Sequence, residues 1–295
     1  MADLNLDQAS GLRRLVQRRP IRVLAVTGGK GGVGKTNVCA NLALALQRRG
    51  RRVMVLDGDL GLANLDILLG VRATRTLEHV FSGQCDLRDV VVRTPSDLLL
   101  LPAASGNYQL AQLTAGQHAG LVHAFSELLE PVDLLLVDTA AGLGDAALTF
   151  SEAAHHVLVV VCDEPAALTD AYGLIKSLSR RGRCTEFQVI ANMVGDAATG
   201  RALFEKLARV SRRFLDNARL TYLGHLPLDP FLRRAVQAQT PVVEAFPGSP
   251  SARAFKKLAV AADNLKTPDV APGHLTFFIE QMVGWGDVSQ EDTLQ

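Results

Sequence analysis

The chain has 295 residues, 48% of them hydrophobic and 21% charged, so it is long and apolar enough to bury a substantial core. Its formal net charge is only +1, so we expect no direct nucleic-acid partner. The four cysteines lie far apart and form no C-x-x-C pair, which argues against a zinc site, an iron–sulfur cluster and a secreted disulfide scaffold.

Short apolar runs alternate with helical patterns, which is typical of a parallel sheet covered by helices on both faces. The runs that we expect to form strands are 21–27, 52–57, 97–102, 133–138, 156–162, 187–193 and 220–226. Helical patterns lie between them at 36–49, 117–129, 168–181 and 200–216. The sequence therefore predicts an α/β, doubly wound, mostly parallel sheet with its ligand at the carboxyl ends of the strands.

Three parts are expected along the chain. Residues 21–265 carry the alternating pattern and form the main domain. Residues 1–20 precede the first strand as a separate N-terminal segment, and residues 266–295 form a linker with a C-terminal amphipathic helix or tail.

A glycine-rich loop follows the first predicted strand. From residue 29 the spacing Gly-x-x-x-x-Gly-Lys-Thr is that of a phosphate-binding loop. Small residues let backbone N–H groups close around phosphate oxygens, Lys35 reaches the β- and γ-phosphates, and the Thr36 hydroxyl can hold Mg²⁺. The residues expected to bind the nucleotide here are Gly29, Lys30, Gly31, Gly32, Val33, Gly34, Lys35, Thr36 and Asn37.

Lys30 is an additional lysine, which the grip on a triphosphate does not require. With it, the run Lys-Gly-Gly-Val-Gly-Lys-Thr resembles the deviant Walker A motif of the MinD/ParA ATPases. In that family the early lysine crosses into the nucleotide site of a partner subunit. The resemblance therefore implies an ATP-bound homodimer in which Lys30 and Lys35 both serve catalysis. The alternative for Lys30 is an ordinary solvated charge.

Two aspartate clusters follow predicted strands, where an ATPase needs them. Asp57 ends one strand and could join Thr36 in the Mg²⁺ shell, and Asp59 could orient or activate the attacking water. Asp138 follows four apolar residues, as in a Walker B strand, and is the third expected metal ligand. In the family, the aspartate at the position of Asp59 is the one associated with hydrolysis. A turn or helix cap is the plain alternative for either cluster.

Recognition of the base is expected at two later strand ends. Asn192 matches the position where relatives hydrogen-bond the adenine edge, and Pro227 and Asp229 match the loop that closes over the base. The Asn-Lys-x-Asp pattern of many GTPases is absent, which favours ATP over GTP. Asparagine and proline are also common in ordinary turns, so that alternative stays open.

The N-terminal segment suggests a branch of the family. Residues 7–13 resemble the Asp-Gln-Ala-x-x-Leu-Arg motif of the FlhG (FleN) branch, MinD-like regulators of flagellar number. There the segment resembles an activating helix that stimulates the GTPase FlhF. A disordered basic lead-in is the alternative. The resemblance implies partner binding by Asp7, Gln8, Ala9, Leu12 and Arg13.

The C-terminal segment has apolar residues at helical spacing. They are Leu275, Phe278, Ile279, Met282 and Trp285. MinD and FlhG relatives carry a C-terminal amphipathic helix that binds the membrane in the ATP-bound dimer. This segment has no Lys or Arg and contains Glu280, so docking on the core or on a partner protein is an equal alternative.

The sequence thus predicts a slow ATPase that binds ATP or ADP with Mg²⁺ and acts as a dimerising switch of flagellar number and placement. By resemblance it stimulates FlhF and restrains a FleQ-like flagellar activator. No export signal or bilayer-spanning run is visible, so we expect a cytoplasmic protein that is peripheral, and polar, on the inner membrane face when ATP is bound. The alternatives are a division-site MinD, a ParA-type partitioning ATPase and a non-hydrolysing ATP-bound module.

Overall fold

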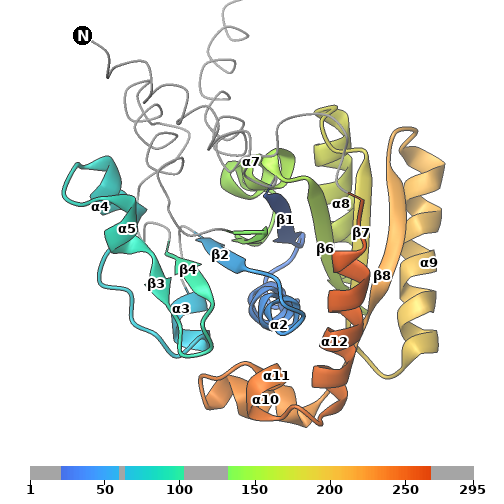
Figure 1. Ribbon diagram of the computed structural model, residues 1–295. Helices are drawn as coiled ribbons and strands as arrows, with labels where there is room; N and C mark the ends of the chain where they lie inside the picture. The colour runs from blue at the N-terminus through green and yellow to red at the C-terminus, as the bar shows by residue number, and fades with distance from the viewer. Residues whose placement is uncertain (1–20, 60–63, 103–131, 267–295) are drawn as a thin grey trace, which may run out of the picture.

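The computed structural model describes residues 21–59, 64–102 and 132–266, which form an 8-stranded sheet between two layers of helices (Figure 1). The strand order is β3-β4-β2-β5-β1-β6-β7-β8. Neighbouring strands pair in parallel except β3 and β4, which are antiparallel at one edge. The predicted α/β, doubly wound and mostly parallel architecture is confirmed.

The strands, in chain order, are β1 (Arg22–Thr27), β2 (Val53–Gly58), β3 (Val92–Arg93), β4 (Leu99–Leu101), β5 (Leu134–Thr139), β6 (His156–Cys162), β7 (Glu186–Val194) and β8 (Arg219–Pro227). The described helices are α2 (Lys35–Gln47), α3 (Leu65–Leu68), α4 (Leu77–Phe81), α5 (Leu87–Val90), α7 (Asp145–Ala153), α8 (Pro165–Arg180), α9 (Ala197–Phe214), α10 (Pro230–Gln237), α11 (Val242–Ala245) and α12 (Pro250–Asp263). Within the described ranges, no helix has the length and apolar character needed to cross a membrane.

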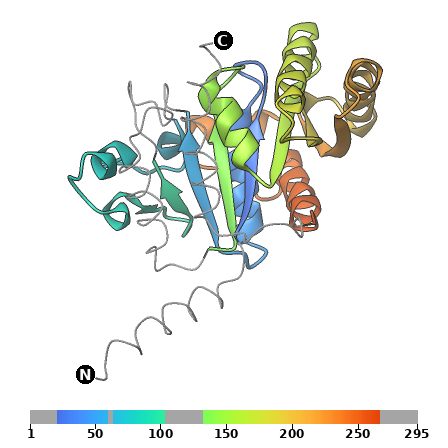
Figure 2. The same ribbon diagram turned by 90° about the horizontal axis from the view of Figure 1, so that it is seen from above.

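The direction of each crossover decides which face a helix covers. From β1 the chain passes through α2 to β2, toward the β3 edge, whereas α7, α8 and α9 lead toward the β8 edge. Because such crossovers are right-handed, α2 lies on one face and the other three lie on the opposite face. Helix α12 packs on α2 and β8. Figure 2 shows from above that α9 lies at the end of the molecule opposite α4 and α5.

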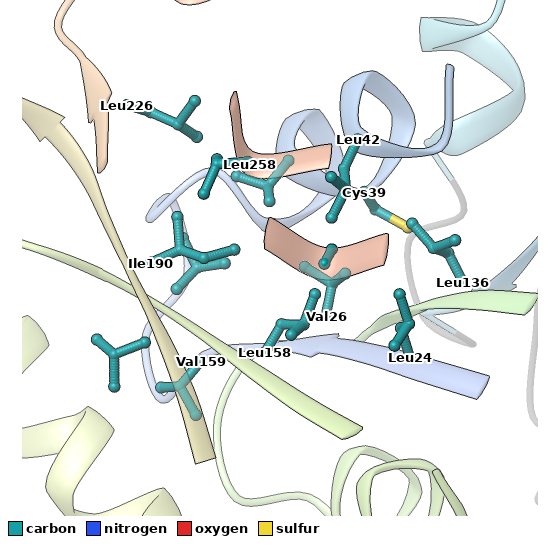
Figure 3. Close-up of a cluster of buried hydrophobic side chains, with 14 of the residues drawn as sticks. Leu24, Val26, Cys39, Leu42, Leu136, Leu158, Val159, Ile190, Leu226 and Leu258 are labelled. Atoms are coloured by element: carbon teal, nitrogen blue, oxygen red, sulfur yellow. The ribbon is translucent and has the colours of Figure 1, made fainter. Parts of the chain in front are cut away.

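The core lies between the sheet and these helices. Central strands β2, β5 and β6 are buried at every residue, which explains their nearly continuous apolar runs. Figure 3 shows side chains from β1, α2 and α12 meeting over the middle of the sheet, among them Val26, Leu42 and Leu258. Because both faces of the central strands are packed, the carboxyl ends of these strands are held in fixed positions next to one another. The polar residues of the candidate site lie at these ends.

The structure differs from the predicted elements mainly at their ends. The fourth strand begins at Leu99 rather than Asp97, because Asp97 has a φ of 65° in the turn before it. Helix α8 begins earlier than predicted, with Pro165 in its first turn, and α9 begins after Asp196, whose carboxylate accepts a hydrogen bond from the Thr199 N–H. The predicted helix at 117–129 lies outside the described residues.

Candidate nucleotide-binding site

The glycine-rich loop, residues 28–34, joins β1 to α2 at the carboxyl edge of the sheet. A Cβ atom on Gly29 would lie 2.1 Å from the carbonyl oxygen of Asp170 in α8, so no larger residue fits. Gly34 has a φ of 91°, and a Cβ atom there would lie 2.5 Å from Nδ2 of Asn192. The loop can follow this path only with glycine at both positions. At its tip Gly31 and Gly32 are exposed, so phosphate can approach the backbone.

Asn192, near the end of β7, is hydrogen-bonded to the glycine-rich loop. Its Nδ2 donates a hydrogen bond of 2.7 Å to the carbonyl of Val33, and its Oδ1 accepts one of 2.9 Å from the Met193 N–H. The residue is only 1% exposed. Here Asn192 positions the loop, a role that the sequence pattern did not indicate, and its contact with adenine stays a prediction.

The two loop lysines have different environments. Lys35 is buried, and its Nζ donates a 3.3 Å hydrogen bond to the carbonyl of Lys30. Burial lowers the pKa of Lys35, while the charges of Asp138 and Asp59 act to raise it. The Nζ of Lys30 lies 2.6 Å from Oε2 of Glu164, and this hydrogen bond raises the pKa of Lys30. The additional lysine is therefore held by an acid of its own chain.

Asp57 and Asp138 lie side by side at the strand ends. The ladder between β2 and β5 places them directly opposite each other, and both are buried. Burial raises the pKa of Asp57 to about 6 and that of Asp138 to about 7, since a carboxylate loses hydration there. Thr36 donates a hydrogen bond from its side chain to Asp138, which opposes the shift. The structure thus brings the three predicted metal ligands together.

These three residues fit a magnesium ion. A hydroxyl and two carboxylates are the oxygen donors that Mg²⁺ prefers. Oδ1 of Asp138 is buried, and the described residues give it no hydrogen-bond partner. A cation beside this oxygen would compensate its burial and return both carboxyl groups to the charged form. On the neighbouring helix turn, Oδ1 of Asn37 is also buried without a partner in the described chain.

Asp59 follows directly after this pair. Its N–H donates a 3.2 Å hydrogen bond to Oδ1 of Asp57, whose Oδ2 accepts a 3.3 Å hydrogen bond from the Leu65 N–H. Asp59 is partly exposed, at the mouth of the buried acid pair. Its predicted role toward the attacking water stays a prediction.

The loop after β5 is tied to the phosphate-binding loop. The N–H of Gly142, at a φ of 92°, donates a 3.2 Å hydrogen bond to the carbonyl of Gly28. The Thr139 hydroxyl donates a 3.2 Å bond to the carbonyl of Val26. The two loops that would flank a γ-phosphate therefore share backbone contacts.

The residues predicted to close over the base lie at the end of β8. Pro227 is its last residue, and Asp229 caps α10. The carboxylate of Asp229 accepts hydrogen bonds from the N–H groups of Phe231 (2.9 Å) and Ser251 (2.8 Å). Burial acts to raise the pKa of Asp229, but these donors hold it below its ordinary value. This carboxylate joins α10 to α12, and contact with a base stays a prediction.

Sequence reasoning did not predict that Lys30 pairs with Glu164. The signal was available, because Glu164 follows β6, the neighbour of β1 in the sheet, and occupies the position just before α8. The predicted partner and membrane contacts lie outside the described residues. They are Asp7, Gln8, Ala9, Leu12, Arg13, Leu275, Phe278, Ile279, Met282 and Trp285.

Comparisons with known proteins agree with this geometry. A family model for ParA, described as NUBPL iron-transfer P-loop NTPase, matches residues 20–262. The antiactivator FleN of Pseudomonas aeruginosa is 52% identical over 272 residues, which are 92% of this chain and 97% of FleN. The flagellum site-determining protein YlxH of Helicobacter pylori is 36% identical over 216 residues, 73% of each chain.

A solved structure shares the fold. The septum site-determining protein MinD of Pyrococcus horikoshii, complexed with Mg-ADP, is 28% identical and has a TM-score of 0.65. The match covers 83% of this chain and 96% of that one. A structural relative with a similar fold was thus solved with Mg-ADP bound.

Proposed function

Because the chain belongs to the MinD/ParA family of P-loop ATPases, we propose that it is an ATP-dependent dimerising switch that regulates flagellar number and placement. The observation that carries the proposal is the acid pair Asp57 and Asp138 beside Thr36 and the glycine-rich loop. The flagellar role is supported by the similarity to FleN and YlxH over most of the chain. Slow turnover suits a switch whose bound state must last.

We assign the nucleotide contacts as follows. Backbone N–H groups of the loop would surround the phosphates, with Lys35 aimed from the base of the loop by its bond to the Lys30 carbonyl. Thr36, Asp57 and Asp138 would hold Mg²⁺, which supplies charge neutralisation of the phosphates. Asp59, at the exposed edge of the pair, would orient the attacking water. Asn192 would keep the loop in its binding shape.

Lys30 would couple nucleotide binding to dimerisation. In the single chain its Nζ pairs with Glu164, and both side chains are at least one third exposed. An exposed ion pair is weak, so a phosphate of a facing subunit can compete for the lysine. In the ATP-bound dimer, Lys30 would leave Glu164 and reach the nucleotide of the second copy.

The outputs would lie at the chain ends. Residues 7–13 would stimulate FlhF, residues 275–285 would bind the inner membrane face or dock on protein, and a FleQ-like activator would be restrained. The support for these partners is the sequence resemblance of both ends and the similarity to FleN.

The switch is tested by measuring molecular size with and without ATP. The variant Asp59→Ala should bind ATP, hydrolyse little of it and accumulate as a dimer by light scattering. Since the substitution leaves Lys30 and Lys35 in place, assembly should persist while hydrolysis is lost. A variant with measured ATP binding that remains monomeric would contradict the proposed ATP-dependent dimerisation.

The flagellar branch is tested by deleting residues 1–19. We expect the truncated protein to keep ATP-dependent dimerisation but to lose stimulation of FlhF GTP hydrolysis. The full chain with Arg13→Ala, which changes one residue predicted to contact FlhF, should lose stimulation as well while keeping its length. Unchanged stimulation by the truncated chain would remove the main reason for choosing the flagellar branch over a division-site MinD.

A further inference from the structure

Three arginines converge on one aspartate at the end of α12. Asp263 lies 3.2 Å from Arg22, 3.3 Å from Arg49 and 2.8 Å from Arg51, measured between charged nitrogen and oxygen atoms. Its side chain is only 7% exposed, whereas those of Arg49 and Arg51 are 37% and 42% exposed. One carboxylate therefore faces three guanidinium groups, and positive charge is left at the surface.

A fourth arginine lies beside this group. Arg52 pairs with Asp133, and its side chain is 50% exposed. Both belong to the same edge of the sheet, because Asp133 accepts the backbone N–H of Arg52 just before β2 and β5 begin. We name Arg22, Arg49, Arg51 and Arg52 the arginine patch. Its cations outnumber the two aspartates that contact them.

The arginine patch lies where α12 ends. Nη1 of Arg22 donates hydrogen bonds to the carbonyls of Asp263 (2.9 Å) and Leu265 (2.7 Å), which ties the end of the helix to the start of β1. The sequence that follows, residues 267–295, contains apolar residues at helical spacing but no Lys or Arg. The positive charge is thus on the folded core, beside the point where this apolar sequence begins.

We propose that the arginine patch binds an anionic lipid surface and supplies the cationic contacts that the C-terminal segment lacks. The inference rests on the proposed membrane association of residues 275–285. A single apolar anchor binds membranes marginally, and a second, electrostatic contact is what makes such binding stable. Arginine also suits lipid phosphates, since its planar group donates two parallel hydrogen bonds.

The test is co-sedimentation of the full chain with lipid vesicles in the presence of ATP and Mg²⁺. One set of vesicles is neutral phosphatidylcholine and the other contains phosphatidylglycerol. The variant Arg49→Gln/Arg52→Gln removes two exposed charges and leaves Arg22 and Arg51 on Asp263. The control Arg72→Gln/Arg233→Gln removes two exposed charges elsewhere.

We expect the patch variant to bind anionic vesicles roughly 25-fold more weakly than wild type, since each of the two arginines contributes about fivefold, and to bind neutral vesicles as well as wild type does. Added salt should weaken the binding of wild type to anionic vesicles until it approaches that of the variant. The variant Asn264→Lys adds a charge beside the patch, at an exposed position, and should bind anionic vesicles more tightly.

Three results would overturn the inference. In the first, the control pair loses as much anionic binding as the patch pair. In the second, anionic vesicles bind no better than neutral ones, in which case the apolar segment acts alone and the proposed membrane association survives. In the third, duplex DNA rather than lipid binding depends on Arg49 and Arg52, which assigns the patch to nucleic acid. If wild type dimerises with ATP but binds neither kind of vesicle, the proposed membrane association of residues 275–285 is also contradicted.

Discussion

Asn192 uses both ends of one buried amide to fix the glycine-rich loop. The nitrogen holds the Val33 carbonyl, and the oxygen holds the N–H of Met193, which has a φ of 57°. Nδ2 also fills the space over Gly34, where a Cβ atom would clash with it. The position of the Asn192 side chain therefore requires glycine at residue 34. At this scale, the shape of the phosphate-binding loop depends on a residue about 160 positions away in sequence.

Replacing Asn192 by Ala should therefore damage the loop. The Val33 carbonyl would lose its buried partner, which costs about 1 to 3 kcal/mol of unfolding free energy. ATP affinity should fall as well, because the loop is no longer held in its binding shape. Urea denaturation and ATP titration measure the two effects. The control Asn217→Ala, at an exposed turn, should change neither. Normal stability and affinity in Asn192→Ala would contradict the positioning role.

Helix α12 shows how one element joins distant parts of the fold. Its beginning contacts the loop after β8 through the bond from Ser251 to Asp229, and its end contacts β1 and the turn after α2 through Asp263. Burial acts to raise the pKa of Asp263, but its hydrogen bond and charge contacts with Arg51 hold the pKa below its ordinary value. Helix α12 is thus anchored at both ends while it packs on α2 and β8.

Asp263→Asn should loosen this anchoring at the end of α12. The guanidinium of Arg22, whose side chain is only 12% exposed, would lose its counter-charge, at a cost of about 1 to 3 kcal/mol in unfolding free energy. A carboxyl with a depressed folded-state pKa stabilises the fold fully above its unfolded pKa near 4, and this contribution is lost as pH falls through the folded value. The difference between wild type and variant should therefore be complete at pH 7 and shrink near pH 3 in chemical denaturation. The control Asp216→Asn, at an exposed turn, should show no difference at either pH.

Predictability from sequence also differs among elements. Parallel strands buried on both faces give unbroken apolar runs, so β1, β2, β5, β6, β7 and β8 were found within about two residues. The two-residue β3 was missed, since it is too short to show a pattern. The loop and the acid pair were predicted because local spacing defines them. The pairings Lys30 with Glu164 and Asn192 with Val33 were not, because they join segments far apart in sequence.

For the whole molecule, the pairing of Lys30 with Glu164 opposes assembly in our proposed mechanism. Glu164→Gln would remove the charge that holds the lysine in its own chain. Half-maximal dimerisation should then need less ATP, by up to about fivefold, since exposed ion pairs are weak. Light scattering across an ATP titration measures the shift.

Glu205→Gln is the control for this variant, because it removes an exposed carboxylate that pairs with Arg212 on α9. We expect it to leave the ATP titration unchanged. A Glu164→Gln chain that needs more ATP than wild type would mean that Glu164 supports the dimer instead.

The end of α12 lies at the opposite edge of the sheet from the glycine-rich loop, because Asp263 contacts the start of β1 while the loop follows its end. Between them lie the central strands β5 and β6, which are buried at every residue. A signal need not be transmitted through that sheet. If ATP merely joins two copies, each copy brings its own terminal segment, and the second contact becomes intramolecular with a high effective concentration. Two terminal segments that each bind weakly would then hold the dimer strongly on the membrane. Hydrolysis of ATP would separate the copies, and both segments would dissociate.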